Sequence, residues 1–129
     1  MAYLKLKAVP LIVIIGICII PLCYADTLTT DTSWYSIESV KREGSCGINA
    51  DGSRFDDTDY TAASWDYRFG TFLLVTNVAN GKAVIVIVRD RGPAKRLYRR
   101  GRKLDLSKSA FQSLAPLAKG VIKVRVEEL

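Results

Sequence analysis

Six consecutive aliphatic residues, Ala83 to Val88, constrain the fold of this 129-residue chain more than any other feature. A strand without a polar face cannot lie at a solvated surface, so it is predicted in the middle of the core. Arg91-Gly92-Pro93 ends it, because proline cannot continue a strand ladder. The β-rich stretch Thr71–Asn77 comes before it, and Val78-Ala79-Asn80-Gly81 predicts a hairpin connection between the two strands.

The C-terminal part predicts more short strands and one helix. Lys103–Leu106 is predicted as a short strand, and Ile122–Val126 as the strand that closes the domain. Ser107 is the predicted N-cap of a helix of about ten residues. The apolar face of that helix comprises Ala110, Phe111, Leu114 and Ala118. Several short strands with one helix, and no alternation of strand and helix, indicate a small closed β-barrel.

Residues 1–25 predict a secretory signal peptide, which leaves a single domain at residues 26–129. Lys5 and Lys7 precede the mostly apolar stretch Ala8–Leu22, and Cys23-Tyr24-Ala25 supplies small residues at the cleavage positions. An uncleaved membrane anchor and lipidation at Cys23 are the alternatives. All three export the domain to the cell envelope or beyond it.

The cysteine and histidine content excludes several kinds of chemistry. After cleavage at Ala25 only Cys46 remains, so no internal disulfide can form, and the role of Cys46 stays open. The chain has 0 histidines, which excludes a Ser-His-Asp triad and removes the usual partners of a zinc site. We therefore expect no metal and no cofactor.

Basic side chains are concentrated between Arg89 and Lys103, where eight bases accompany one acid in a chain of net charge +6. Such a run is typical of nucleic-acid binding. Export argues against that partner, as does the presence of Tyr98 as the one aromatic residue in the run. Contact with an anionic envelope polymer or a membrane surface is the better prediction, and a solvated basic loop is the alternative.

Six motifs follow one another along the domain. They are Thr32-Ser33-Trp34-Tyr35, Asn49–Asp56, Tyr60–Ser64 with Phe69-Gly70-Thr71, Val75-Thr76-Asn77 with Asn80-Gly81-Lys82, Asp90-Arg91-Gly92-Pro93, and Leu104-Asp105-Leu106-Ser107. Each alone has little specificity. In this order and at this spacing, they resemble the RlpA family of exported double-psi β-barrel proteins across nearly the whole domain.

This resemblance implies a mainly β fold, a six-stranded double-psi β-barrel with one or two short helices. It also implies an endolytic lytic transglycosylase that cuts between N-acetylmuramic acid and N-acetylglucosamine and leaves 1,6-anhydro ends. The substrate would be peptidoglycan glycan strands, with a preference for strands that lack stem peptides. The alternative is a non-catalytic module that binds or loosens wall glycan, as expansins do. We expect the protein to be a monomer.

The chemistry of such a reaction needs a carboxyl group, and the matching motifs contain two, Asp90 and Asp105. Asp90 ends the most apolar strand, so we predict that it is the drier group and the general acid and base. Asp105 precedes a helix start, where the helix dipole would keep its pKa low and suit it to stabilising positive charge. The structural alternative pairs Asp90 with Arg89 or Arg91 and makes Asp105 a helix cap.

Two positions depart from the family pattern. The glutamate of the family's turn motif is Ser53 here, and its histidine is Ser64. A hydroxyl can donate a hydrogen bond but cannot act as an acid or base near neutral pH, so these two are predicted only as substrate contacts. Tyr35 and Arg91, by their motif positions, complete the predicted substrate-binding set.

Overall fold

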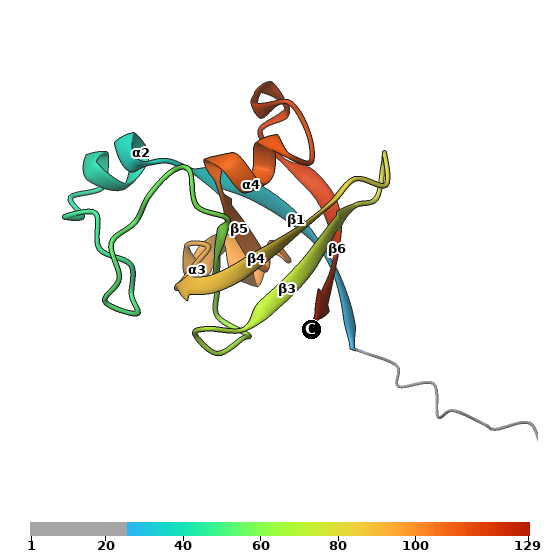
Figure 1. Cartoon of the computed structure of the whole chain (residues 1–129), viewed down its shortest axis with the longest axis horizontal. Helices are drawn as coiled ribbons and strands as arrows, with labels where there is room; N and C mark the ends of the chain where they lie inside the picture. The colour runs from blue at the N-terminus through green and yellow to red at the C-terminus, as the bar shows by residue number, and fades with distance from the viewer. Residues whose placement is uncertain (1–25) are drawn as a thin grey trace, which may run out of the picture.

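The computed structural model describes residues 26–129, so the predictions about the signal peptide and Cys23 lie outside the described residues. The described chain forms a closed barrel of six strands with short helices at its ends (Figure 1). The strands are β1 (Thr27–Tyr35), β2 (Thr61–Ser64), β3 (Phe72–Asn77), β4 (Ala83–Asp90), β5 (Leu104–Ser107) and β6 (Ile122–Glu128). The helices are α2 (Ile37–Arg42), α3 (Lys95–Arg99), α4 (Lys108–Gln112) and the 3-10 turn η2 (Leu117–Lys119).

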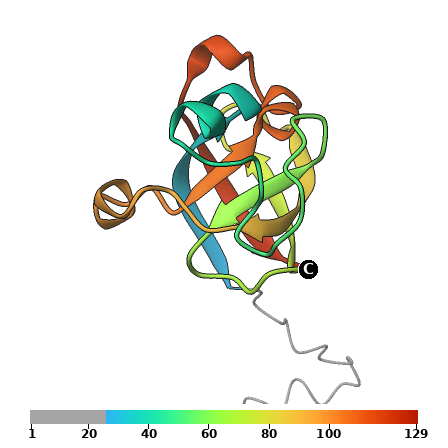
Figure 2. The same cartoon turned by 90° about the vertical axis from the view of Figure 1, so that its left-hand side faces the viewer.

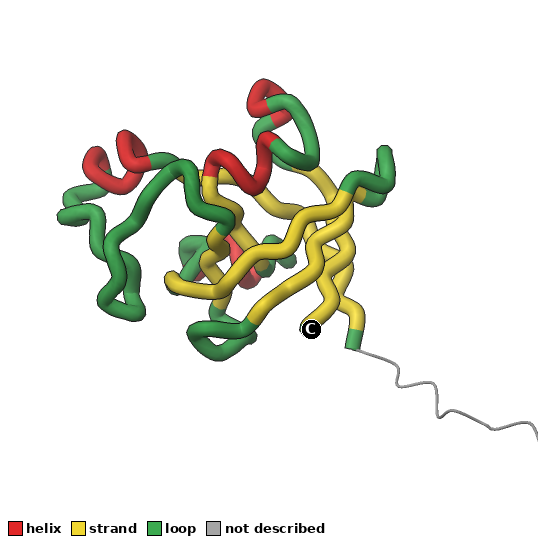
Figure 3. Tube along the Cα trace, viewed as in Figure 1, coloured by secondary structure: helices red, strands yellow, loops and turns green. Residues whose placement is uncertain are grey.

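Both parallel and antiparallel pairs close the barrel, in the order β1-β5-β2-β4-β3-β6. Strand β1 pairs in parallel with β5, and β2 in parallel with β4, while the other four pairs are antiparallel. The predicted hairpin of β3 and β4 is among these antiparallel pairs, and long loops make the crossovers that the parallel pairs need (Figure 3). The mainly β double-psi barrel is confirmed.

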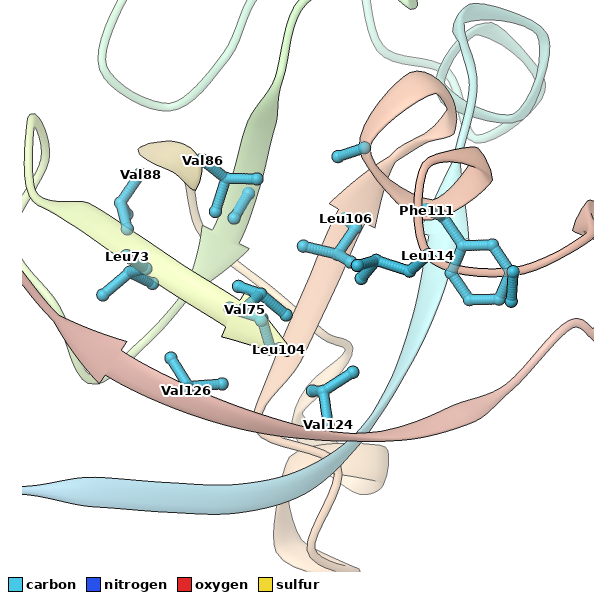
Figure 4. Packing of buried hydrophobic residues seen from close by; sticks show 13 residues of the cluster. Leu73, Val75, Val86, Val88, Leu104, Leu106, Phe111, Leu114, Val124 and Val126 are labelled. Carbon is cyan, nitrogen blue, oxygen red and sulfur yellow. The ribbon is translucent and has the colours of Figure 1, made fainter. Parts of the chain in front are cut away.

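Aliphatic side chains from every other strand position fill the barrel (Figure 4). In β3, for example, Leu73 and Val75 are buried, and their neighbours point outward. The same alternation corrects the prediction for Ala83–Val88. Val86 and Val88 are buried in the core, but Ile85 is 51% exposed, because a barrel strand has one inner face and no described segment covers its outer face here.

The helix predicted after Ser107 is shorter than expected. Helix α4 ends at Gln112, and a separate 3-10 turn follows Pro116, so Ala118 is exposed instead of continuing an apolar face. Phe111 and Leu114 are fully buried as predicted and close one end of the barrel. Ser107 occupies the N-cap position, but its hydroxyl donates to the carbonyl of Asp59 and accepts from the N–H of Thr61.

The sequence analysis did not predict α2 and α3. Helix α2 begins with a capping box in which Ser36 and Ser39 bond each other's backbone N–H groups. Helix α3 stands well away from the barrel at the end of the loop that follows β4 (Figure 2). Within residues 26–129, no helix has the length and apolar character needed to cross a membrane.

Candidate active site

The strand register brings the two predicted catalytic carboxylates into one row. Ala63 of β2 pairs with Asp90 of β4 on one side and with Asp105 of β5 on the other. Two strand spacings separate the aspartates, so their Cα atoms lie roughly 10 Å apart. The two motifs that seemed independent in the sequence therefore meet across one small residue.

Both aspartates line a cleft of about 270 Å³, together with Tyr35 from the end of β1. Glu43 just beyond α2 also lines the cleft, as do Arg96 and Arg102 from the loop around α3. Gly92 also lines the cleft, and a Cβ atom at this position would come within 3.2 Å of the Ala63 Cβ. The glycine of the Asp-Arg-Gly-Pro motif is thus explained by close packing against β2.

The Asp105 carboxylate is largely buried. Its side chain is 17% exposed, and burial raises its pKa from 3.8 to about 6, against the opposing effects of Arg102 and the N–H of Ser33. The Nε atom of Arg102 lies 3.3 Å from Oδ1 of Asp105, yet neither atom completes a hydrogen bond. Within residues 26–129, Oδ1 is enclosed by protein and has no hydrogen-bond partner, while the residue itself lines the cleft.

The raised pKa overturns the prediction that a helix dipole keeps Asp105 ionised at low pH. The short helix α4 begins only at Lys108, and Asp105 lies within β5, between β1 and β2. Burial among three strands outweighs the field of a five-residue helix. A raised pKa is one property expected of a general acid.

Two backbone N–H groups donate hydrogen bonds to the carboxylate of Asp90. Its Oδ1 accepts hydrogen bonds from the N–H of Ala50 at 3.0 Å and from the N–H of Arg91 at 2.9 Å. The turn that contains Ala50 is fastened to β4 a second time, because Asp51 forms a salt bridge of 3.3 Å with Arg89. The contacts fix the orientation of the Asp90 carboxylate at the rim of the cleft.

Tyr35 contributes a buried hydroxyl to the cleft. Its ring stacks on Phe55 with centroids 4.9 Å apart, and burial raises the pKa of its hydroxyl. The hydroxyl lies near that of Thr61, but neither completes a well-formed hydrogen bond. Within residues 26–129 this hydroxyl is therefore enclosed and unpaired, which is energetically costly.

The other predicted substrate contacts do not all reach the cleft. Arg91 lines it, but the guanidinium donates from one nitrogen to the carbonyls of Ser64 and Tyr67, each at 2.8 Å, and stacks on Phe69. Ser64 is fully buried, and its hydroxyl accepts from the N–H of Asp66. Ser53 bonds to Asp51 within its own turn. None of these three has a side chain presented mainly to a ligand.

The structure adds Glu43, Arg96 and Arg102 to the cleft. The sequence analysis did not predict Glu43, and it named the two arginines only as part of the basic run Arg89–Lys103. Of the three, only Arg102 could have been linked to the site from the sequence, because it stands three residues before Asp105, with which it forms an ion pair. Within residues 26–129 no group of three or more histidine, cysteine, aspartate or glutamate side chains could hold a metal ion.

Replacing Arg91 with lysine is expected to destabilise the domain by about 1–3 kcal/mol, because lysine cannot donate both hydrogen bonds and stack on Phe69 at once. Urea unfolding would measure the loss. The control is Arg68→Lys, on an exposed residue of the β2–β3 loop that Arg91 contacts, with an expected change within about 0.5 kcal/mol. Unchanged stability with weakened glycan binding would instead assign Arg91 to the substrate.

Fold and cleft together define a double-psi β-barrel protein with a carboxylate-lined groove. The family model described as lytic transglycolase matches residues 27–126, and the chain belongs to that family. A probable endolytic peptidoglycan transglycosylase RlpA of Aquifex aeolicus is 42% identical over 97 residues, which cover 75% of this chain and 39% of the relative. The endolytic peptidoglycan transglycosylase RlpA of Neisseria meningitidis serogroup A is 36% identical over 103 residues, which cover 80% of this chain and 39% of the relative. The chain thus spans about two-fifths of the length of these two relatives.

Solved structures share the barrel. A Streptomyces papain inhibitor matches with a TM-score of 0.61 at 24% identity, over 81% of this chain and 94% of that one. The apo expansin of Clavibacter michiganensis matches with a TM-score of 0.58 at 24% identity, over 81% of this chain and 50% of the expansin. At such identities the likeness shows the fold alone.

Proposed function

We propose that this chain is an endolytic lytic transglycosylase that cleaves peptidoglycan glycan strands between N-acetylmuramic acid and N-acetylglucosamine. The observation that carries the proposal is the Asp105 carboxyl group, buried in the cleft with an unbonded Oδ1 and a pKa raised to about 6. Family membership and the names of the relatives support the choice of substrate. A carboxyl group that is partly protonated near neutral pH can supply the proton that the leaving sugar needs.

Asp105 would act twice in each turnover. It first donates its proton to the glycosidic oxygen as the bond from that oxygen to C1 of the muramic acid breaks. The resulting carboxylate then accepts the proton of the C6 hydroxyl of the same sugar, as O6 bonds to C1 and closes the 1,6-anhydro ring. No water is consumed, so a single carboxyl group serves as both acid and base.

Two neighbours would assist this step. Positive charge develops on C1 and the ring oxygen, and the oriented carboxylate of Asp90, in the same row of the sheet, would stabilise it. Tyr35 lines the same cleft and would contact the bound sugar. The whole cleft is built from one chain, which is consistent with action as a monomer.

The proposal includes the cellular location of the reaction. Residues 1–25 would direct export to the envelope, as a cleaved signal peptide or, with Cys23 lipidated, as an anchor. Peptidoglycan lies outside the cytoplasm, so export and substrate agree.

The test is product analysis by mass spectrometry after incubation of purified protein with glycan strands from which stem peptides have been removed. Internal cleavage should yield fragments with 1,6-anhydro ends, each lighter by one water than the product of hydrolysis. Reducing ends instead of anhydro ends would contradict transglycosylation. Binding without any cleavage would support the second candidate.

That second candidate is a non-catalytic module that binds or loosens wall glycan. The observation in its favour is that Ser53 and Ser64 stand where the family has a glutamate and a histidine, and both hydroxyls are bonded within the protein. The expansin fold shares this barrel. Sedimentation with the glycan in the absence of new ends would identify such a module.

A further inference from the structure

The loop that carries α3 is the most basic part of the described chain. We call residues 94–103 the basic arm. It contains six lysine and arginine side chains and no acid. Lys95, Arg96, Arg99 and Arg100 are exposed, and within residues 26–129 only one cation of the arm, Arg102, forms a salt bridge. Five positive charges therefore have no acidic partner in the described part of the chain.

The arm is held in place by stacking on aromatic rings. The Nζ atom of Lys95 lies 3.6 Å from the ring centroid of Trp65, and that of Lys103 lies 3.6 Å from the ring centroid of Tyr98. Trp65 is itself fixed by a hydrogen bond from Nε1 to the carbonyl of Pro93, and the Tyr98 hydroxyl donates to Asp66. Although α3 stands out from the barrel in Figure 2, these contacts tie it to the β2–β3 loop. Two of its six cations, Lys95 and Lys103, are held in this way, which lowers the ordering cost of binding.

One wall of the cleft belongs to this arm. Arg96, Leu97 and Arg102 of the arm line the same cleft as Asp90 and Asp105. A strand lying in the cleft would therefore continue over the arm. Lys95 and Arg99 are four residues apart in α3, so their side chains lie on the same face of the helix. The same spacing separates Arg96 from Arg100, the residue that caps the helix. A repeating anionic polymer matches such a continuous basic surface better than a single anion does.

We propose that the basic arm binds carboxylate groups carried by the glycan strand that occupies the cleft, and so selects carboxylated over neutral glycan. This inference rests on the proposed function for the identity of the polymer. N-acetylmuramic acid carries a lactyl side chain, whose carboxylate is free wherever no peptide is attached. Arginine forms paired, charge-assisted hydrogen bonds with carboxylates, and Arg96 stands where the cleft meets the arm.

The test compares binding to two forms of the same strands. Peptide-free glycan strands are used directly or after their carboxyl groups have been converted to neutral amides. The ratio of the two dissociation constants reports recognition of carboxylate alone. The Asp105→Asn background keeps the strands intact during the measurement. In this background the protein is expected to bind the native strands at least about tenfold more tightly, and the preference should shrink as salt is added.

The arm is tested with R96Q/R99Q/R100Q against a matched control, K82Q/K119Q/K123Q, which removes three exposed charges elsewhere. The arm variant should bring the native-to-amidated ratio close to one, whereas the control should change it less than about twofold. Equal binding of the two strand forms by the unmutated arm would overturn the proposal, and so would equal effects of the two triple variants.

Vesicles distinguish a membrane from the glycan as the partner. Sedimentation with vesicles of phosphatidylglycerol, lost in the arm variant, together with no preference for carboxylated strands, would reassign the arm to anionic lipid and overturn the proposal. Failure of the proposed function is a separate result, because release of anhydro ends is measured with the unmutated protein. A protein that prefers carboxylated strands but releases no anhydro ends would retain the arm's role and lose the enzymatic one.

Discussion

Asp105→Asn is expected to lower the rate of anhydro-end formation by about 10²–10⁴-fold, since asparagine can neither donate nor accept the proton. Folding should be retained, because the asparagine side chain would fill the same space within β5. Glycan binding should change little by comparison. The rate is measured from the yield of anhydro-ended fragments over time, and binding from sedimentation with the strands.

The matched control is Asp31→Asn, on an exposed residue of β1. It removes the same charge from the outside of the barrel and should leave the rate within about twofold of the original. Asp90→Asn should slow the reaction less than Asp105→Asn does, because Asp90 stabilises charge and transfers no proton in this mechanism. A larger effect at Asp90 than at Asp105 would restore the roles that the sequence suggested.

The pH dependence gives a second readout of Asp105. Only the protonated acid can start the reaction, so activity should fall about tenfold per pH unit above the pKa of about 6, where this step limits the rate. The free energy of unfolding should also depend on the protonation of Asp105. Its pKa is raised from 3.8, so the native state binds more protons than the unfolded state between about pH 4 and pH 6, and stability falls as pH rises through that window. In Asp105→Asn, this part of the decline in urea unfolding free energy should disappear.

The barrel could be predicted because its signals are local. The aliphatic run of β4 and the turn at Asn80-Gly81 specify a hairpin without reference to the rest of the chain, and the motif order supplied the topology. The exposed outer face of β4 escaped prediction, because an aliphatic run cannot reveal whether a second layer covers the strand. Ile85 is the residue that shows the difference.

The candidate site was only half predictable. Asp90 and Asp105 were found by motif, but their relative burial depends on which strands flank each of them, and that depends on parallel pairings between distant segments. The helix-dipole argument was wrong because it considered neighbours in sequence alone. Glu43 caps the end of one short helix and Arg96 lies in another, and neither helix has a strong apolar pattern, so nothing in the sequence placed them beside the carboxylates.

Phe111→Ala is expected to destabilise the domain by about 3–5 kcal/mol, because the ring is fully buried where α4 closes the barrel and its removal leaves a cavity. The matched control is Phe72→Ala in β3, where the ring is 53% exposed on the outer face, and the expected loss is at most about 1 kcal/mol. Urea unfolding at constant pH gives both values. Comparable losses would mean either that α4 contributes little to the core or that the outer face of β3 is covered in solution. A large difference would show that the inner face of the barrel and its helical end hold β5, and with it Asp105, in place.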